Sequence, residues 1–268
     1  MFRPTSLSGK TFHRYLKIPA HPSKIRLQNI AGKKFFSNGL SIKNENGVLF
    51  TLDANDWITR IMLMEGDYED GSTSLAKKIL SNGGMFIDLG ANFGLFTCII
   101  AHNNNKVKAI AVEPNYKVID RLLHNIRQNG LQESVQVVNA AVSNKFQLVT
   151  MEQPATDNLG TTIVKPGIQG LLSIPSCPLE FIFQENNISH ADLIKIDIEG
   201  NEFDILENFP FEKYTIKNII LEFNHLSNIS FSVLNTFLAG KGFKSFTITG
   251  EELLHDQQAI PENNIWFV

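Results

Sequence analysis

FIDLGANFG, at residues 86–94, predicts a short apolar strand that ends in a turn bounded by Gly90 and Gly94. The apolar run that follows, residues 95–101, predicts a helix directly after the second glycine. Because glycine carries no Cβ, a strand-turn-helix unit of this kind lets the backbone approach a ligand closely, beside the N-terminus of the helix. The stretch therefore predicts an α/β domain that binds a nucleotide-type cofactor.

The spacing of the glycines distinguishes this turn from the dinucleotide fingerprint G-x-G-x-x-G, which binds a pyrophosphate. Here Asn92 lies between the two glycines, and Asp88 precedes them. A carboxylate beside the turn repels a pyrophosphate and attracts a cation. S-adenosylmethionine carries both an ammonium group and a sulfonium, so the stretch favours this methyl donor over a nicotinamide cofactor. A tight turn without a cofactor, as in any doubly wound domain, is the alternative.

A second acidic residue, Glu113, ends another predicted strand, at residues 108–112. A carboxylate at this point of a doubly wound fold can accept two hydrogen bonds from a ribose. Glu113 is therefore the candidate ribose ligand. It also favours the N-terminus of the helix predicted from about Asn115 to Gly130, and the two roles are compatible.

Composition predicts a single α/β domain with an N-terminal extension. The chain has 268 residues, 43% of them hydrophobic and 19% charged, which is enough to bury a full core. The net charge of −3 gives no global attraction to nucleic acid. The sequence contains no run of about twenty apolar residues and no secretory signal, so we expect a cytoplasmic protein with its two cysteines reduced.

The N-terminal segment, residues 1–46, is basic up to Glu45. Before Glu45 it contains nine Lys or Arg residues and no Asp or Glu. Such an extension can attract an acidic substrate, an anionic membrane surface or an acidic patch on a second subunit. The alternative, which we favour from the sequence, is a solvated and partly ordered arm.

Apolar strands alternate with helical patterns along the rest of the chain, which predicts a parallel sheet of right-handed β-α-β units. Later strands are expected at 135–139, 191–197 and 218–223. Two final strands, at 243–248 and 264–268, have no helix between them and are expected to pair antiparallel. Residues 144–190 are expected to form a hairpin or lid insertion that shapes the acceptor pocket.

Polar side chains gather where two of these strands end. Asp197 and Glu199 follow the strand at 191–197, and Glu222, Asn224 and His225 follow the strand at 218–223. For methyl transfer to a hydroxyl, Asp197 or His225 is the candidate general base. Alternatively, Asp197, Glu222 and Asn224 hold a Mg²⁺-type ion that acidifies the hydroxyl. We favour metal-free catalysis because these ligands form no tight motif, and capping of the next helix accounts for one of the acids.

In this order the motifs resemble those of the FkbM family of S-adenosylmethionine-dependent methyltransferases. The resemblance covers roughly residues 47–225 and rests on Asn55-Asp56-Trp57, Gly66-Asp67-Tyr68-Glu69, residues 86–94, Val112-Glu113-Pro114 with Asn125, residues 193–200 and Ile220-Leu221-Glu222. It implies a Rossmann-like class I methyltransferase domain over residues 47–268. The implied sheet is mostly parallel and seven-stranded, of order 3-2-1-4-5-7-6, with its last strand antiparallel. The implied reaction is O-methylation of a small molecule or a glycan.

The same resemblance assigns residues to each part of the site. The methionine end of the donor would contact Asp88, Gly90, Asn92 and Gly94, the ribose Glu113, and the adenine Asn139, Ala140 and Ala141. Glu69, next to Tyr68, would lie near the mouth for the cofactor or acceptor. Asp197 would border the donor and, with Glu199, Glu222 and His225, face the acceptor. A nicotinamide-dependent oxidoreductase and a non-catalytic binding protein are the alternative functions, and a homodimer is a compatible assembly.

Overall fold

The centre of the fold is a seven-stranded sheet built around β4 (Gly84–Leu89), which carries the first half of the glycine turn. The computed structural model describes residues 1–66, 68–152, 163–167, 172–198, 200–223, 227, 229–254, 260 and 263–268. Across the sheet the strands run β15 (Ser245–Thr247), β16 (Asn264–Phe267), β14 (Ile219–Glu222), β12 (Leu193–Ile196), β4, β5 (Val107–Val112) and β6 (Val135–Val138).

Read from β6 to β15, the sheet has the strand order 3-2-1-4-5-7-6. The strands from β14 to β6 are parallel, whereas β16 pairs antiparallel with both β14 and β15. The predicted class I topology, with its last strand antiparallel, is thus confirmed. All five parallel strands end at the same edge, so the residues that follow them meet there.

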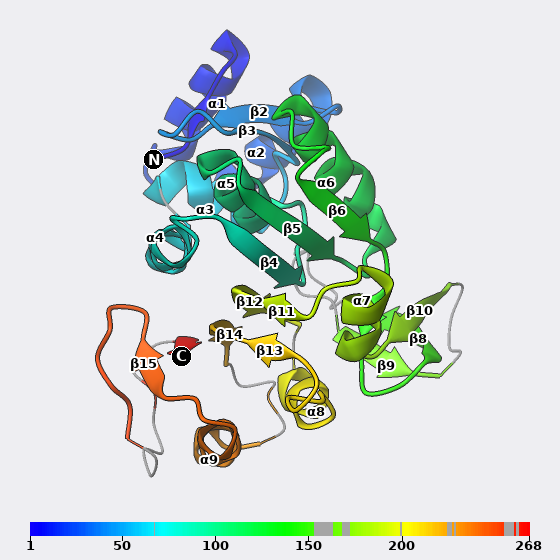
Figure 1. Ribbon diagram of the computed structural model, residues 1–268. Coiled ribbons are helices and arrows are strands. Elements are labelled where there is room, and N and C mark those ends of the chain that lie inside the picture. Colours follow the sequence, from blue (N-terminus) through cyan, green and yellow to red (C-terminus); the bar gives the residue numbers. More distant parts are fainter. Residues whose placement is uncertain are drawn as a thin grey trace.

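Helices cover both faces of the sheet, as Figure 1 shows. One layer contains α4 (Asp70–Ile79), α5 (Leu95–Asn103) and α6 (Tyr116–Gln128), and the other contains α7 (Leu179–Glu185), α8 (Glu202–Glu207) and α9 (Phe231–Gly240). Adjacent residues of β4 serve different layers, since Phe86 packs with the first and Ile87 with the second. Strands buried on both faces explain the nearly continuous apolar runs in the sequence.

The N-terminal segment is folded, which corrects the expectation of a solvated arm. It forms β1 (Arg3–Pro4), α1 (Leu7–Leu16), α2 (Lys24–Phe35) and β2 (Leu40–Lys43), which is followed by β3 (Leu49–Leu52) and α3 (Trp57–Glu65). β1, β2 and β3 form an antiparallel sheet, so the expected division at residue 46 falls inside the β2–β3 hairpin. Phe2, Phe12 and Leu16 belong to the core cluster that also contains Phe86. Burial of these apolar side chains outweighs the repulsion among the basic residues.

Four short strands between residues 141 and 177 form a second, smaller sheet. Its order is β7 (Ala141–Val142), β10 (Ser173–Cys177), β8 (Gln147–Glu152) and β9 (Ile163–Pro166), and β8 pairs antiparallel with β9. A further strand pair joins β11 (His190–Ala191) to β13 (Thr215–Ile216). A lid function for residues 144–190 stays a prediction. In the described part of the chain, every helix is too short or too polar to cross a membrane.

Asn125 joins the N-terminal sheet to the glycine turn. Its side chain is fully buried, accepts a hydrogen bond from the Thr51 N–H at 2.9 Å and donates one to the Phe93 carbonyl at 2.8 Å. Because Asn125→Ala leaves both backbone groups without partners, we expect it to lower the free energy of unfolding by about 2 kcal/mol. Urea unfolding measures this change. The matched control is Arg127→Ala on the exposed side of the same helix, and an equal loss in both variants would contradict this role of Asn125.

Candidate active site

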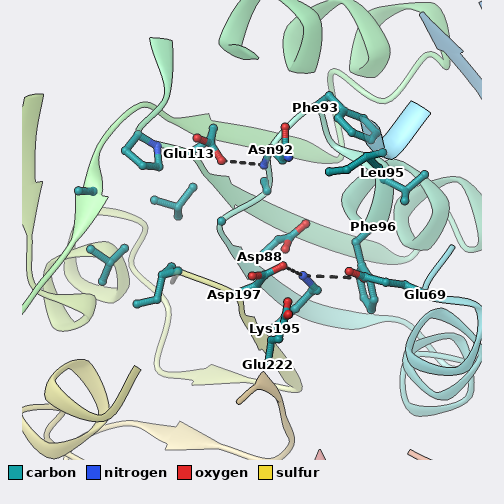
Figure 2. Close-up of a pocket in the computed structure, with 18 of the residues that line it drawn as sticks. Glu69, Asp88, Asn92, Phe93, Leu95, Phe96, Glu113, Lys195, Asp197 and Glu222 are labelled. Atoms are coloured by element: carbon teal, nitrogen blue, oxygen red, sulfur yellow. Dashed lines mark hydrogen bonds and ion pairs between the residues drawn. The ribbon is translucent and has the colours of Figure 1, made fainter. Parts of the chain in front are cut away.

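Carboxylates from four neighbouring strands converge on one cavity at the carboxyl edge of the sheet (Figure 2). Asp88 belongs to β4, Glu113 follows β5, Asp197 follows β12 and Glu222 ends β14. Glu69, which directly precedes α4, adds a fifth carboxylate. The cavity has a volume of about 260 Å³, which is close to the lower end of the range of small-molecule sites.

The turn after β4 has left-handed backbone conformations at Gly90, Asn92 and Gly94, with φ of 85°, 49° and 82°. A Cβ on Gly90 would lie 1.8 Å from the carbonyl oxygen of Asp197, and one on Gly94 would lie 2.5 Å from Leu122 Cδ1. Gly90 therefore allows close contact between β4 and the end of β12. Gly94 allows α5 and α6 to pack, and it is not part of the described cavity wall.

Backbone N–H groups from two segments, the turn after β4 and the start of α6, hold the Glu113 carboxylate. One carboxylate oxygen accepts a hydrogen bond from the Asn92 N–H and the other from the Asn115 N–H, each at 2.7 Å. Burial raises the pKa of Glu113 to about 7, although these two hydrogen bonds lower it. Each oxygen retains a further lone pair, so the carboxylate can accept two more hydrogen bonds from a ligand.

The raised pKa of Glu113 predicts how stability depends on pH. Its proton binds more tightly in the folded protein, so the associated stability is fully present below the ordinary pKa of 4.5 and is lost as the pH rises through about 7. We expect this group to remove about 3 kcal/mol from the free energy of unfolding over that range. Denaturant unfolding from about pH 5 to about pH 8 measures it, and Glu113→Gln is expected to flatten the slope by that amount. The same slope in the variant and the wild type would contradict the assignment.

The described part of the chain leaves one carboxylate oxygen of Asp88 without a hydrogen-bond partner. The side chain is fully buried; its Oδ2 accepts a hydrogen bond from the Thr97 hydroxyl, while Oδ1 has no hydrogen-bond partner among the described residues. Burial raises the pKa of Asp88. A buried carboxylate oxygen without a partner is costly, and a cationic or N–H-bearing ligand in the cavity would satisfy it.

Lys195 is a site residue that the sequence analysis did not assign. It lies in β12, beside Asp88 in β4, and its ammonium is 2.8 Å from Asp197 Oδ2 and 3.9 Å from Glu69 Oε2. It also lies 5.5 Å from the centre of the Phe96 ring. Burial alone would lower the pKa of Lys195, but the surrounding carboxylates raise it well above 10.5. A lysine within the apolar, fully buried strand LIKI was the signal that could have revealed this role.

Glu69, Asp197 and Glu222 form a cluster whose carboxylate oxygens lie within 4.8 Å of one another. Burial, followed by the charge of Asp197, raises the pKa of Glu222 to about 8. The buried surroundings and the negative charge of Asp197 therefore favour the protonated form of Glu222. Oxygen ligands at this spacing suit a divalent cation, whereas Lys195 already neutralises part of the charge. Of the expected metal ligands, Asp197 and Glu222 come together, and Glu69 is the third member here.

Other predicted site residues differ in their placement. Ala140 lines the cavity, whereas the Asn139 side chain donates to the backbone carbonyls of Glu113 at 2.7 Å and Pro114 at 3.3 Å. Asn139 therefore holds the loop after β5. Glu199, Asn224 and His225 lie outside the described residues. The cavity wall also includes Trp57, Ile58 and Phe96, to which the sequence analysis assigned no part of the site.

The sheet order and the acidic carboxyl edge define a Rossmann-like class I methyltransferase fold. The sequence profile described as Methyltransferase FkbM domain matches residues 88–245, more than half of the chain. The chain belongs to the FkbM methyltransferase family.

Solved structures with a similar fold are distant in sequence. The TrmK protein of M. capricolum, in complex with S-adenosyl-homocysteine, is 18% identical over 73% of this chain and 65% of its own, with a TM-score of 0.43. The precorrin-6y C5,15-methyltransferase of Geobacter metallireducens GS-15 is 10% identical over 73% of this chain and 84% of its own, with a TM-score of 0.39. Similarity at this level does not extend to activity or substrate. Among curated proteins no match was found.

Proposed function

We propose that this protein is an O-methyltransferase that transfers the methyl group of S-adenosylmethionine to a hydroxyl of a small molecule or a glycan. The observation that carries the proposal is the convergence of Asp88, Glu113, Asp197 and Glu222 from four neighbouring strand ends. Family membership supports methyl transfer and S-adenosylmethionine as the donor, and it disfavours the nicotinamide alternative.

The residues at the donor end fit this cofactor. Asp88 Oδ1, buried and without a partner among the described residues, suits the ammonium group, and Glu113 suits the two ribose hydroxyls. The apolar wall at Ala140 and Ala141 suits the adenine ring. When bound, S-adenosylmethionine supplies an electrophilic methyl group on its sulfonium. The protein residues orient the donor and exclude water from it.

The acceptor end is acidic, which disfavours an anionic acceptor and suits a neutral hydroxyl. In our proposal the Asp197 carboxylate, positioned by the Lys195 ammonium, takes the proton of the acceptor hydroxyl. In its protonated form, which the raised pKa of Glu222 favours, Glu222 donates a hydrogen bond to Asp197. His225 and Glu199 remain alternative candidates for the general base. A divalent ion on Glu69, Asp197 and Glu222 that acidifies the acceptor hydroxyl is the other route.

The cytoplasmic location also stays a prediction.

A screen of hydroxyl acceptors with labelled donor, with and without EDTA, tests this function. Turnover that persists in EDTA is expected, because the proposal assigns the proton to Asp197. Asp197→Asn is expected to lower turnover by about 100-fold while the affinity for S-adenosylhomocysteine stays within about threefold. The matched control is Asp204→Asn on the exposed side of α8, which should retain full turnover. Loss of turnover in EDTA would favour the metal-dependent route, and full turnover by Asp197→Asn would exclude Asp197 as the base.

A further inference from the structure

Helix α2 has the opposite of the usual amphipathic arrangement. Its four large apolar residues are exposed, with Ile25 at 69%, Leu27 at 45%, Ile30 at 49% and Phe35 at 64% of full exposure. The buried positions of the helix are Gln28 and Gly32 instead. A helix on a globular domain normally turns its apolar side chains to the core, so this outward set indicates an interaction surface. We call Ile25, Leu27, Ile30 and Phe35 the outer apolar set.

Basic side chains lie among the outer apolar set. Arg26, Lys33 and Lys34 are exposed on the same helix, and Lys10 and Arg14 are exposed on the neighbouring α1. No acidic residue occurs in the sequence before Glu45, so no carboxylate of residues 1–44 offsets this charge. The surface therefore combines exposed aliphatic and aromatic side chains with exposed Lys and Arg side chains.

This combination selects among possible partners. A second copy of the same surface would bring like charges together, which opposes self-association. A nucleic acid would suit the positive charge but gives no favourable burial to three exposed aliphatic side chains. An anionic lipid surface satisfies both features, since lipid headgroups attract Lys and Arg while the acyl boundary accepts the apolar side chains.

We propose that the outer face of α2, with the adjoining basic residues of α1, binds the surface of an anionic membrane. The helix lies in the plane of the interface, without crossing the bilayer. At about 100° per residue, Leu27 and Ile30 share its outer side with Arg26, Lys33 and Lys34, whereas Ile25 and Phe35 flank that side near the two ends of the helix. In Figure 1, α1 lies at the opposite end of the molecule from α9 and β15. This inference does not depend on methyl transfer.

Contacts of α2 connect this surface to the cavity. Arg60 of α3 donates to Asn29 Oδ1 of α2 at 2.6 Å, and a Cβ on Gly32 would lie 2.2 Å from Asn55 Oδ1. α3 begins at Trp57, which lines the cavity and is itself exposed. The membrane-binding helix thus packs directly against the element that forms one wall of the site.

Vesicle flotation of the full chain tests the proposal. One set of vesicles contains phosphatidylcholine alone, and the other contains phosphatidylcholine mixed with phosphatidylglycerol. We expect flotation with the mixed vesicles, weak flotation with the neutral ones and a decrease as salt increases. Combined replacement of the outer apolar set by serine is expected to weaken binding by at least about tenfold, and so is combined Arg26→Gln, Lys33→Gln and Lys34→Gln.

A matched control replaces two exposed apolar residues elsewhere, Val233→Ser and Leu254→Ser, and should float like the wild type. Circular dichroism and the thermal midpoint confirm that each variant is folded, which is expected because the replaced side chains are exposed. Absence of flotation with the mixed vesicles, or unchanged flotation of the serine variant, would overturn the proposal. It would also be overturned if the wild type were a dimer, the serine variant a monomer, and neither bound vesicles. Tighter binding of the wild type to RNA than to the mixed vesicles would overturn it as well.

Discussion

Replacing Gly90 with alanine is expected to lower the free energy of unfolding by about 4 kcal/mol or more. Two independent effects contribute. The new Cβ would lie 1.8 Å from the Asp197 carbonyl oxygen, which belongs to the backbone and cannot move aside without separating β4 from the end of β12. The residue also has a φ of 85°, which is strained for any side chain with a Cβ. Urea unfolding at constant pH measures the loss.

Gly130→Ala is the matched control for this prediction. Gly130 has a φ of 68°, but no described atom lies within 4 Å of the position that a Cβ would take, so only backbone strain is expected, about 1 kcal/mol. The difference between the two variants isolates the steric contact at Asp197. If Gly90→Ala cost no more than Gly130→Ala, the close approach of the two strand ends would be wrong.

Glu113→Ala is expected to raise the dissociation constant for S-adenosylhomocysteine by about 100-fold. The substitution removes the carboxylate that we assign to the ribose hydroxyls. It also leaves the N–H groups of Asn92 and Asn115 without their acceptor, so the turn after β4 loses a hydrogen bond that holds it. Isothermal titration calorimetry measures the affinity, and circular dichroism confirms that the variant is folded.

Two further variants separate the charge of Glu113 from its hydrogen bonds. Glu113→Gln retains one carbonyl acceptor and is expected to lose less affinity than Glu113→Ala. Glu133→Ala removes an exposed carboxylate away from the cavity and should bind like the wild type. Affinity of Glu113→Ala within about threefold of the wild type would rule out the ribose assignment.

Much of the fold followed from local sequence signals. The apolar strands, the glycine turn and the helical patterns each depend on nearby residues, and together they predicted a parallel sheet whose last two strands pair antiparallel. The order of the strands followed from the resemblance to the FkbM family. Asp88, Glu113, Asp197 and Glu222 could be assigned to one edge because parallel strands end on the same side of a sheet. Such an assignment needs only the ends of the strands and not their side-chain geometry.

Features that depend on contacts between distant segments were not predictable in this way. Lys195 acquires its role from the strand register that sets it beside Asp88, and from Glu69, which is far away in the sequence. The basic N-terminal segment looked like a solvated arm because its charge is visible in the sequence. Its burial of Phe2 and Phe12 against the rest of the core is visible only in the folded chain.

The most direct test of the donor site is calorimetric titration of the intact protein with S-adenosylhomocysteine near neutral pH, with NADH titrated in parallel. The site formed by Asp88 and Glu113 predicts saturable binding of one S-adenosylhomocysteine per chain and no binding of NADH. Binding of NADH without binding of S-adenosylhomocysteine, or no binding of either, would contradict the central claim that this cavity holds a methyl donor.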